Sequence, residues 1–265
     1  MTICVAAIGR CDDIGKDCEA VVFATDHMIT LKQIGQFEHA VEKYRKINSN
    51  TVAMLSGEAL LFDEVLKGAT ETGNLDEIGQ KIHQNMISIR DMRISKLIFE
   101  KLKIDFDFLK ELLKAPAHNA TVENILSTIE KFKLDTTVLI VGFKDNLAQL
   151  VEINEFNLTN TRDINFDAIG SGSVQALNTL LFQRHSKADD LKATLYNVYK
   201  AKRNSEVAVG VGKETDLLIL FPSGKLHKIG DKEAGLLANI YAEEMICGKE
   251  HKDLKEVVSH VGGDE

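Results

Sequence analysis

The sequence predicts an α+β fold in which two antiparallel sheets carry helices on their outer faces. Runs of strand-like residues alternate with runs of helical periodicity, in the order ββββ–αα(α)–βββ–αα–ββ–α. This order disfavours a parallel doubly wound sheet, in which single strands and helices alternate. Only 2 of the 265 residues are proline, and no segment differs in composition from its flanks. We therefore expect one domain over residues 1–249 and a charged, flexible tail over 250–265.

The first half of the chain supplies four of the expected strands. An apolar run directly after Thr2 and another over 20–25 predict two strands joined by a polar, glycine-containing loop. Apolar residues spaced three and four apart predict a long amphipathic helix over 75–103. The elements expected in this half are strands at 2–8, 20–25, 37–47 and 51–56, a helix after Gly57, the helix at 75–103, and short helices at 105–114 and 121–134.

The second half supplies the remaining strands and the last helices. Two apolar runs around the turn residues Lys-Asp-Asn predict a strand pair, and Pro-Ser-Gly separates another pair near the C-terminus. The elements expected here are strands at 136–143, 147–153 and 164–169, helices at 174–184 and 188–204, strands at 216–221 and 225–229, and a helix at 231–249.

Charge and hydropathy exclude several classes of partner. The net charge of −8 argues against nucleic acid or an anionic membrane surface as a partner. No apolar stretch reaches the roughly 18 residues of a membrane span, and ICVAAI is too short for a secretion signal. We expect a cytoplasmic protein without a nucleic-acid or membrane partner.

The four cysteines do not make a disulfide framework in a chain of this length. Cys11 and Cys18 flank the first predicted loop, and their spacing is wider than that of zinc-binding thiolates. We expect plain thiols, no metal site and no cofactor.

Thr2 is a hydroxyl residue joined directly to an apolar strand. If Met1 is removed, its α-amine, with a reference pKa of ~7.7–8.0, can act as the base that a hydroxyl nucleophile needs. The alternative is an ordinary Met-Thr start without chemical meaning. Lys43 in a strand pattern can disfavour protonation of such an amine, or can simply face solvent. Asp26, after an apolar strand, can hold the lysine in place or cap a turn.

Three glycine-containing segments are further candidates. The N–H of Gly57, at a strand end, can serve an oxyanion hole, or the glycine can be there only for its conformation. The GSGS segment that contains Ser171 is typical of an anion-cradling loop or of a helix N-cap, and it lacks the lysine of a nucleotide-binding P-loop. The segment from Glu206 to Asp216 predicts a tight turn.

These features occur in an order that resembles the proteasome β-subunit family of N-terminal nucleophile (Ntn) hydrolases over roughly residues 2–249. The chain is most similar to uncharacterised bacterial and archaeal proteasome-like proteins that begin Met-Thr-(Val/Ile)-Cys. The resemblance is carried by TICVAAI, AVVFATDHMIT, KYRKI with AMLSGEAL, AIGSGSVQAL and YKAKRNSEVAVGVGKETD. It implies a four-layer αββα sandwich, a peptide or protein substrate, no cofactor, and association into a homo-oligomer.

The resemblance also implies a role for each candidate. Thr2 would be the nucleophile, Asp26 and Lys43 the acid and the lysine beside it, and Gly57 the oxyanion donor. Ser171 would hydrogen-bond near the terminal amine. Glu206 is the nearest match to a second acid, the backbone of Thr30 would pair with an extended substrate, and Val41, Leu55 and Ala59 would line the pocket for the residue before the cut.

Some positions depart from the family pattern. Glu206 is displaced by Ser205, and Val209 stands where the family has a serine. Only Met1 precedes Thr2, so we expect maturation by methionine aminopeptidase rather than autolysis. The segment 104–134 is longer than a proteasome helical pair requires, which favours an oligomer other than stacked proteasome rings.

The sequence therefore predicts a threonine-type amide hydrolase that acts through an acyl-enzyme. One alternative is a transpeptidase or ligase that passes the same acyl group to an amine. The other is an inactive scaffold with the same fold, which the departure at Val209 favours and the joint presence of Thr2, Asp26, Lys43 and Gly57 disfavours.

Overall fold

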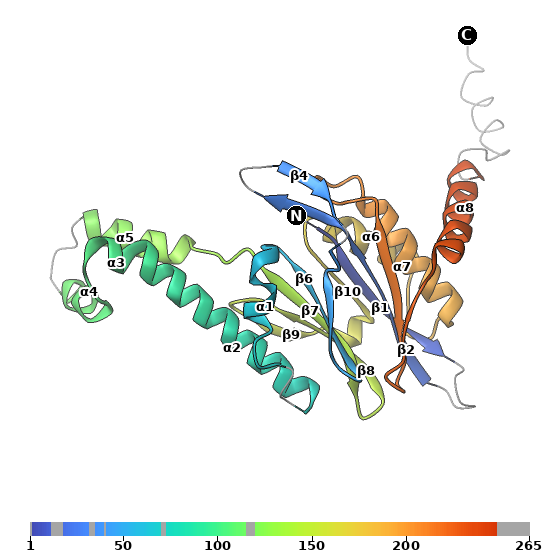
Figure 1. Cartoon of the computed structure of the whole chain (residues 1–265), viewed down its shortest axis with the longest axis horizontal. Coiled ribbons are helices and arrows are strands. Elements are labelled where there is room, and N and C mark those ends of the chain that lie inside the picture. The colour runs from blue at the N-terminus through green and yellow to red at the C-terminus, as the bar shows by residue number, and fades with distance from the viewer. Residues whose placement is uncertain are drawn as a thin grey trace, which may run out of the picture.

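The computed structural model describes residues 2–11, 18–31, 35–39, 41–69, 73–114 and 120–247. Over these residues the chain forms an α+β fold with two five-stranded antiparallel sheets and helices packed beside them (Figure 1). The predicted α+β class and antiparallel sheets are therefore confirmed. Met1 and the expected tail over 250–265 lie outside the described residues.

The first sheet contains the N-terminal strand and has the order β10-β1-β2-β11-β12. Its strands are β1 (Cys4–Cys11), β2 (Cys18–Asp26), β10 (Phe166–Ile169), β11 (Thr215–Leu220) and β12 (Leu226–Lys228). β1 and β2 form a hairpin whose register places Cys4 opposite Thr25 and Cys11 opposite Cys18. Asp26 therefore ends β2 beside the point where β1 begins.

Both faces of β1 are buried, which explains the unbroken apolar run at the start of the sequence. Cys4 and Ile8 belong to a cluster shared with side chains of the second sheet. Val5, on the opposite face, packs in a cluster with α6 (Ser173–Phe182) and α7 (Leu191–Ser205). Because strand side chains alternate between faces, a strand buried on both sides is continuously apolar.

The second sheet has the order β5-β6-β7-β8-β9. Its strands are β5 (Tyr44–Asn48), β6 (Thr51–Ser56), β7 (Thr137–Lys144), β8 (Leu147–Ile153) and β9 (Leu158–Asn160). One face of this sheet packs in a cluster with side chains of α1 (Phe62–Val65) and α2 (Leu75–Ile94). α8 (Asp231–Cys247) lies beside α7 at the other side of the molecule (Figure 1).

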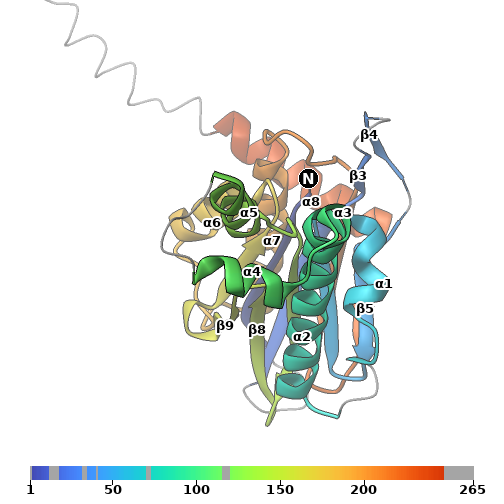
Figure 2. The ribbon, with the colours of Figure 1, turned by 90° about the vertical axis from the view of Figure 1, so that its left-hand side faces the viewer.

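From Ile94 on, the described residues 94–114 and 120–131 form a helical arm that projects from the sheets (Figures 1 and 2). The arm contains a π-helical turn (Ser95–Phe99), α3 (Glu100–Leu102), α4 (Phe106–Leu113) and α5 (Ala120–Lys131). Its own small core consists of Ile94, Ile98, Leu109, Val122 and Ile125. Among the described residues, no helix has both the length and the apolar character to cross a membrane.

Several sequence-predicted elements are corrected. The strand predicted over 37–47 is wrong as a single strand, because its residues divide between β4 (Gly35–Glu38) and β5. Lys43 lies in the irregular segment directly before β5 rather than in a strand. Apolar residues continue to occur across this break, and no proline or glycine marks it. β3 (Met28–Leu31), which pairs with β4, and β9 are strands that the sequence analysis missed.

The prediction of plain thiols is wrong for one pair of cysteines. Cys11 and Cys18 stand opposite each other in the β1–β2 hairpin and form a disulfide, with Cα atoms 5.1 Å apart. That separation is ordinary for a disulfide. The hairpin register creates the pairing, and spacing along the sequence does not specify a register.

His185 joins the end of α6 to the first sheet. Its imidazole Nε2 lies 2.9 Å from the Ile8 carbonyl oxygen, which can only accept, so Nε2 carries the proton. Nδ1 lies 3.2 Å from a carboxylate oxygen of Asp189. Burial lowers the pKa of His185, although Ile8 and Asp189 act in the opposite direction.

The buried imidazole should make stability depend on pH. A His pKa that is lower in the folded than in the unfolded state means that the unfolded chain binds more protons, so stability falls as pH decreases below the unfolded value of about 6.5. We expect wild type to lose more unfolding free energy between about pH 7.5 and about pH 5 than the His185→Gln variant loses. Urea unfolding of both proteins at the two pH values measures this, and equal losses would contradict the assignment.

Candidate active site

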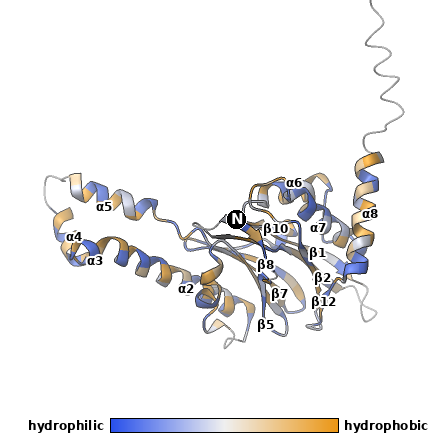
Figure 3. Ribbon diagram, turned by 45° about the horizontal axis from the view of Figure 1, so that its top comes forward, coloured by the Kyte–Doolittle hydropathy of each residue, from blue (hydrophilic) through white to orange (hydrophobic). Residues whose placement is uncertain are grey.

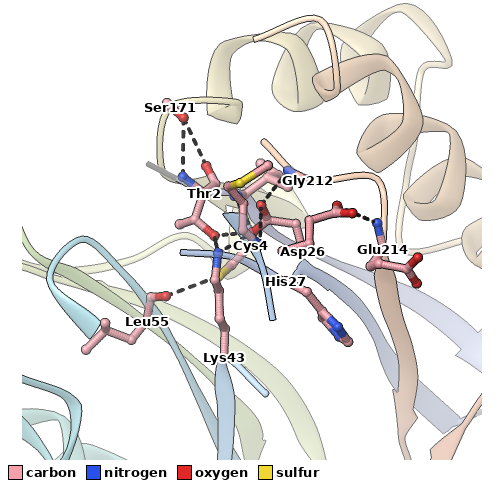
Figure 4. A network of polar contacts seen from close by, with 12 residues as sticks. Thr2, Cys4, Asp26, His27, Lys43, Leu55, Ser171, Gly212 and Glu214 are labelled. Carbon is pink, nitrogen blue, oxygen red and sulfur yellow. Dashed lines mark hydrogen bonds and ion pairs between the residues drawn. The ribbon is translucent and has the colours of Figure 1, made fainter. Parts of the chain in front are cut away.

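Thr2 lies two residues before β1 and is buried, with only 2 % of its surface exposed. Its carbonyl oxygen accepts a hydrogen bond from the Gly172 N–H at 3.3 Å. Its Oγ1 contacts Lys43 Nζ and Asp26 Oδ1, as Figure 4 shows. The hydroxyl that the sequence analysis singled out is therefore fixed within a polar cluster between strands of both sheets.

Asp26 organises this cluster through both carboxylate oxygens. Oδ1 accepts from the Ile3 N–H at 3.1 Å and from Lys43 Nζ at 2.7 Å, in addition to the Thr2 hydroxyl. Oδ2 accepts from the Gly212 N–H at 2.7 Å and from a second backbone N–H, that of Met28, at 3.3 Å. The β1–β2 register sets this position, because the Asp26 N–H donates to the Ile3 carbonyl at 3.2 Å.

Lys43 reaches the cluster from the second sheet. Its carbonyl accepts from the Leu55 N–H at 3.1 Å, which fixes its backbone beside β6. Its side chain is 11 % exposed, and the ammonium donates to both Thr2 Oγ1 and Asp26. Hydrogen bonds from a charged donor are stronger than those between neutral groups. The ammonium can therefore hold the Thr2 oxygen in one orientation.

Ser171 lies on the other side of Thr2, in the loop between β10 and α6. Its Oγ is 3.3 Å from the Thr2 backbone nitrogen, which donates. The Ser171 hydroxyl has two carbonyl acceptors within reach, that of Val209 at 3.1 Å and that of Thr2 at 3.4 Å. The serine therefore contacts the Thr2 nitrogen, where the sequence analysis expected it.

Gly57 directly follows β6 and has a φ of +119°. N–H groups two residues apart along a strand point to the same side, so the Gly57 N–H faces the edge where the Leu55 N–H meets Lys43. Among the described residues it has no hydrogen-bond acceptor. The group is therefore free to donate to a ligand oxygen near Thr2.

A pocket opens beside these residues. Its apolar wall includes the three side chains that the sequence analysis assigned to it, Val41, Leu55 and Ala59. The complete lining is Thr2, Met28, Ile29, Val41, Glu42, Lys43, Arg45, Leu55, Gly57, Ala59, Phe62 and Asp63. The nucleophile candidate and the oxyanion donor candidate thus share one cavity with an apolar wall.

Glu206 and Thr30 are not among the residues that hydrogen-bond to Thr2 in the described part of the structure. The Glu206 carboxylate pairs with Lys202 Nζ at 2.7 Å and with Arg203 at 3.0 Å. Thr30 belongs to β3, where its backbone pairs with Gln36, and its side chain is outside the described part of the structure. The sequence analysis missed Gly212 as a ligand of Asp26, although its Gly-Val-Gly segment marked a tight turn.

Cys4 is a second nucleophilic group near the cluster. Its side chain is fully buried, and its Sγ lies 3.6 Å from the Leu55 carbonyl oxygen. Burial raises the pKa of the thiol, and the nearby positive charge of Lys43 only partly offsets this. A thiol held neutral is a poor nucleophile, so Thr2 is the better candidate.

The described residues contain no group of three or more His, Cys, Asp or Glu side chains placed to hold a metal ion. A comparison with protein-family models found no match, and a search among curated proteins found no similar sequence.

Proposed function

We propose that this chain is an Ntn-type threonine hydrolase that cleaves an amide bond in a peptide or protein. The observation that carries the proposal is the contact of a buried Thr2 hydroxyl with Lys43 and Asp26, which are themselves 2.7 Å apart. A hydroxyl needs an adjacent base and fixed geometry to act as a nucleophile. Removal of Met1 would free the α-amine of Thr2 to act as that base.

The packing of the sheets supports the finer fold assignment. One buried cluster lies between the two sheets, and two others lie between a sheet and its helices. We propose that these layers form the four-layer αββα sandwich of Ntn hydrolases. In that arrangement the strand ends that carry Thr2, Asp26 and Gly57 meet at one edge of the inner layers.

The first chemical half forms an ester. Thr2 Oγ would attack the substrate carbonyl carbon while its proton passes to the α-amine. The oxyanion of the tetrahedral intermediate would accept from the Gly57 N–H. Collapse would break the C–N bond, and the protonated α-amine would return its proton to the leaving amine. The product is an acyl-Thr2 ester and a free amine.

In the second step, water hydrolyses the acyl-Thr2 ester, and the α-amine again transfers the proton. The α-amine would take a proton from water, whose oxygen attacks the ester carbonyl, and Thr2 Oγ would recover a proton as it leaves. Lys43 would favour the neutral form of the amine by like charge. Asp26 would keep the lysine in place.

This chemistry requires Thr2 to carry a free amine, so Met1 must be removed. The apolar pocket wall favours an apolar side chain before the scissile bond. We also propose self-association, since α4 and its neighbours in the helical arm expose large apolar side chains, among them Phe106 at 55 % and Phe108 at 51 %. The ribbon of the arm carries both hydrophobic and hydrophilic colours in Figure 3.

A covalent probe tests the proposed nucleophile. A peptide epoxyketone with an apolar residue next to the warhead reacts with both the hydroxyl and the amine of a terminal threonine. We expect it to add once to the protein that lacks Met1, and fragment mass spectrometry should place the adduct on Thr2. Intact mass measured before treatment gives the proportion of chains that begin at Thr2.

The same preparation supplies a matched control. Protein made with Met1 retained has the same side chains but no free amine on Thr2, so we expect no adduct. An adduct on the Met1-retaining form, or none on the processed form, would reject the amine-assisted mechanism. No adduct on the processed form would also favour the inactive scaffold.

A further inference from the structure

Lys202, on α7, is a buried cation without a role in the steps above. Its side chain is 0 % exposed, and burial lowers the pKa of the ammonium although Glu206 acts in the opposite direction. The ammonium carries three N–H donors, and three acceptor oxygens lie within hydrogen-bond distance of it. These are Glu206 Oε1 at 2.7 Å, the Lys213 carbonyl at 2.7 Å and the Gly212 carbonyl at 3.0 Å. A buried ammonium is tolerated only with such partners.

The carbonyls that Lys202 binds belong to the segment between α7 and β11, and this segment touches the candidate active site twice. The Gly212 N–H donates to Asp26 Oδ2 at 2.7 Å. The Val209 carbonyl accepts from Ser171 Oγ at 3.1 Å, and Ser171 in turn contacts the Thr2 nitrogen. One ammonium therefore anchors the segment that contacts both Asp26 and Ser171.

Lys202 also places positive charge near Asp26. Asp26 contacts the Lys43 ammonium directly on one side and Gly212 on the other, and Gly212 separates it from Lys202. The charge of Asp26 is felt at Lys202, where it favours the charged ammonium. The carboxylate thus lies between two cations, one from the segment before β5 and one from α7.

We propose that Lys202 is a positioning residue for acylation of Thr2. It holds the 209–213 segment so that Gly212 orients Asp26 and Val209 orients Ser171. Glu206 then serves as the counter-ion of Lys202 and acts on Thr2 only through this lysine. This inference rests on the proposed function for its effect on rate, whereas the placement of Gly212 by Lys202 can be tested without any reaction.

The rate test uses the double variant Lys202→Met/Glu206→Gln. Both replacements are uncharged and similar in shape, so the fully buried ammonium and its carboxylate are removed together. Arg203, the second partner of Glu206, is 33 % exposed and stays in contact with solvent. We expect the maximal rate constant of epoxyketone inactivation to fall at least about 10-fold, while the probe concentration for half-maximal rate changes by less than about 3-fold. Probe binding should change little because no residue of α7 is among the described residues that line the pocket, whereas the reaction step depends on the placement of Asp26 and Ser171.

The matched control is Lys200→Met. Lys200 lies two residues away on the same helix, is also largely buried, and also pairs with a glutamate, Glu244. It has no contact with the 209–213 segment in the described structure. We expect wild-type inactivation kinetics for this variant. Thermal unfolding of each variant shows whether it is folded at the assay temperature.

Amide hydrogen exchange of Gly212 tests the placement directly. We expect its exchange in the double variant to be at least about 10-fold faster than in wild type and in Lys200→Met, because its bond to Asp26 opens more often. Unchanged Gly212 exchange, or an unchanged maximal inactivation rate in a folded double variant, would overturn the proposal. If wild type forms no adduct but Gly212 exchange still accelerates, the proposed function fails and the placement by Lys202 is supported.

Discussion

The Thr2→Ala variant is expected to form no covalent adduct with a peptide epoxyketone under conditions that label wild type completely. The reason is local, since Thr2 Oγ1 is the hydroxyl in contact with both Lys43 and Asp26. Removing the nucleophile of a coupled group of residues costs roughly 10⁶-fold in rate, which is far below detection here. Thr2→Ser keeps the hydroxyl and the amine, and we expect it to label more slowly than wild type.

Thr25→Val is the matched control for the nucleophile. Thr25 is fully buried next to Asp26, and its Oγ1 has no hydrogen-bond partner among the described residues. Valine has nearly the same shape, so this change removes a hydroxyl beside the cluster without altering a contact. We expect labelling at the wild-type rate, and stability unchanged or higher by about 1 kcal/mol. Complete labelling of Thr2→Ala would place the nucleophile elsewhere in the chain.

Gly57→Ala is expected to lower the free energy of unfolding by about 3 kcal/mol or more and to abolish labelling. The φ of +119° is a conformation that alanine rarely adopts. In addition, a methyl group there would overlap the carbonyl oxygen of Asp135 and lie 2.8 Å from Thr136 Cα. Both neighbours are backbone atoms of the segment before β7, so relief requires the β6–β7 edge to separate and the Gly57 N–H to move.

Gly35→Ala separates the two causes of this loss. Gly35 has the same φ of +119°, but a methyl group there would have no described atom within 4 Å. We expect this control to lose about 1 to 2 kcal/mol, from backbone strain alone. Urea unfolding of the three proteins gives the difference. Equal losses in the two variants would show that the overlap with Asp135 and Thr136 is relieved without cost.

Local sequence patterns predicted much of the fold because they report burial directly. The unbroken apolar run after Thr2 and the spacing of Ile78 and Ile82 in α2 follow from which faces are covered. The break between β4 and β5 was not predicted, because no proline or glycine marks it. This break matters for Lys43. Because Lys43 lies outside the strand, its side chain does not follow the alternation of β5, and its ammonium contacts Thr2.

The candidate site was predicted in part, from residues that lie at the ends of strands. Thr2, Asp26, Lys43 and Ser171 do come together, and Gly57 lies at the same pocket. Lys202 could not be predicted, since a lysine near the end of a helix ordinarily faces solvent. Its burial depends on the path of the chain after α7, which no local pattern encodes. At the same end of α7, Glu206 pairs with Lys202.

The disulfide between Cys11 and Cys18 has a consequence at the opposite end of its hairpin. β1 and β2 carry the nucleophile and the acid at their paired ends, and the covalent bond closes their other ends. A shift of one residue between the strands would turn Asp26 to the other face of the sheet, away from Thr2. The disulfide between Cys11 and Cys18 would have to break before such a slipped hairpin could form. The disulfide thus fixes the register of the hairpin, and this register places Asp26 beside Thr2.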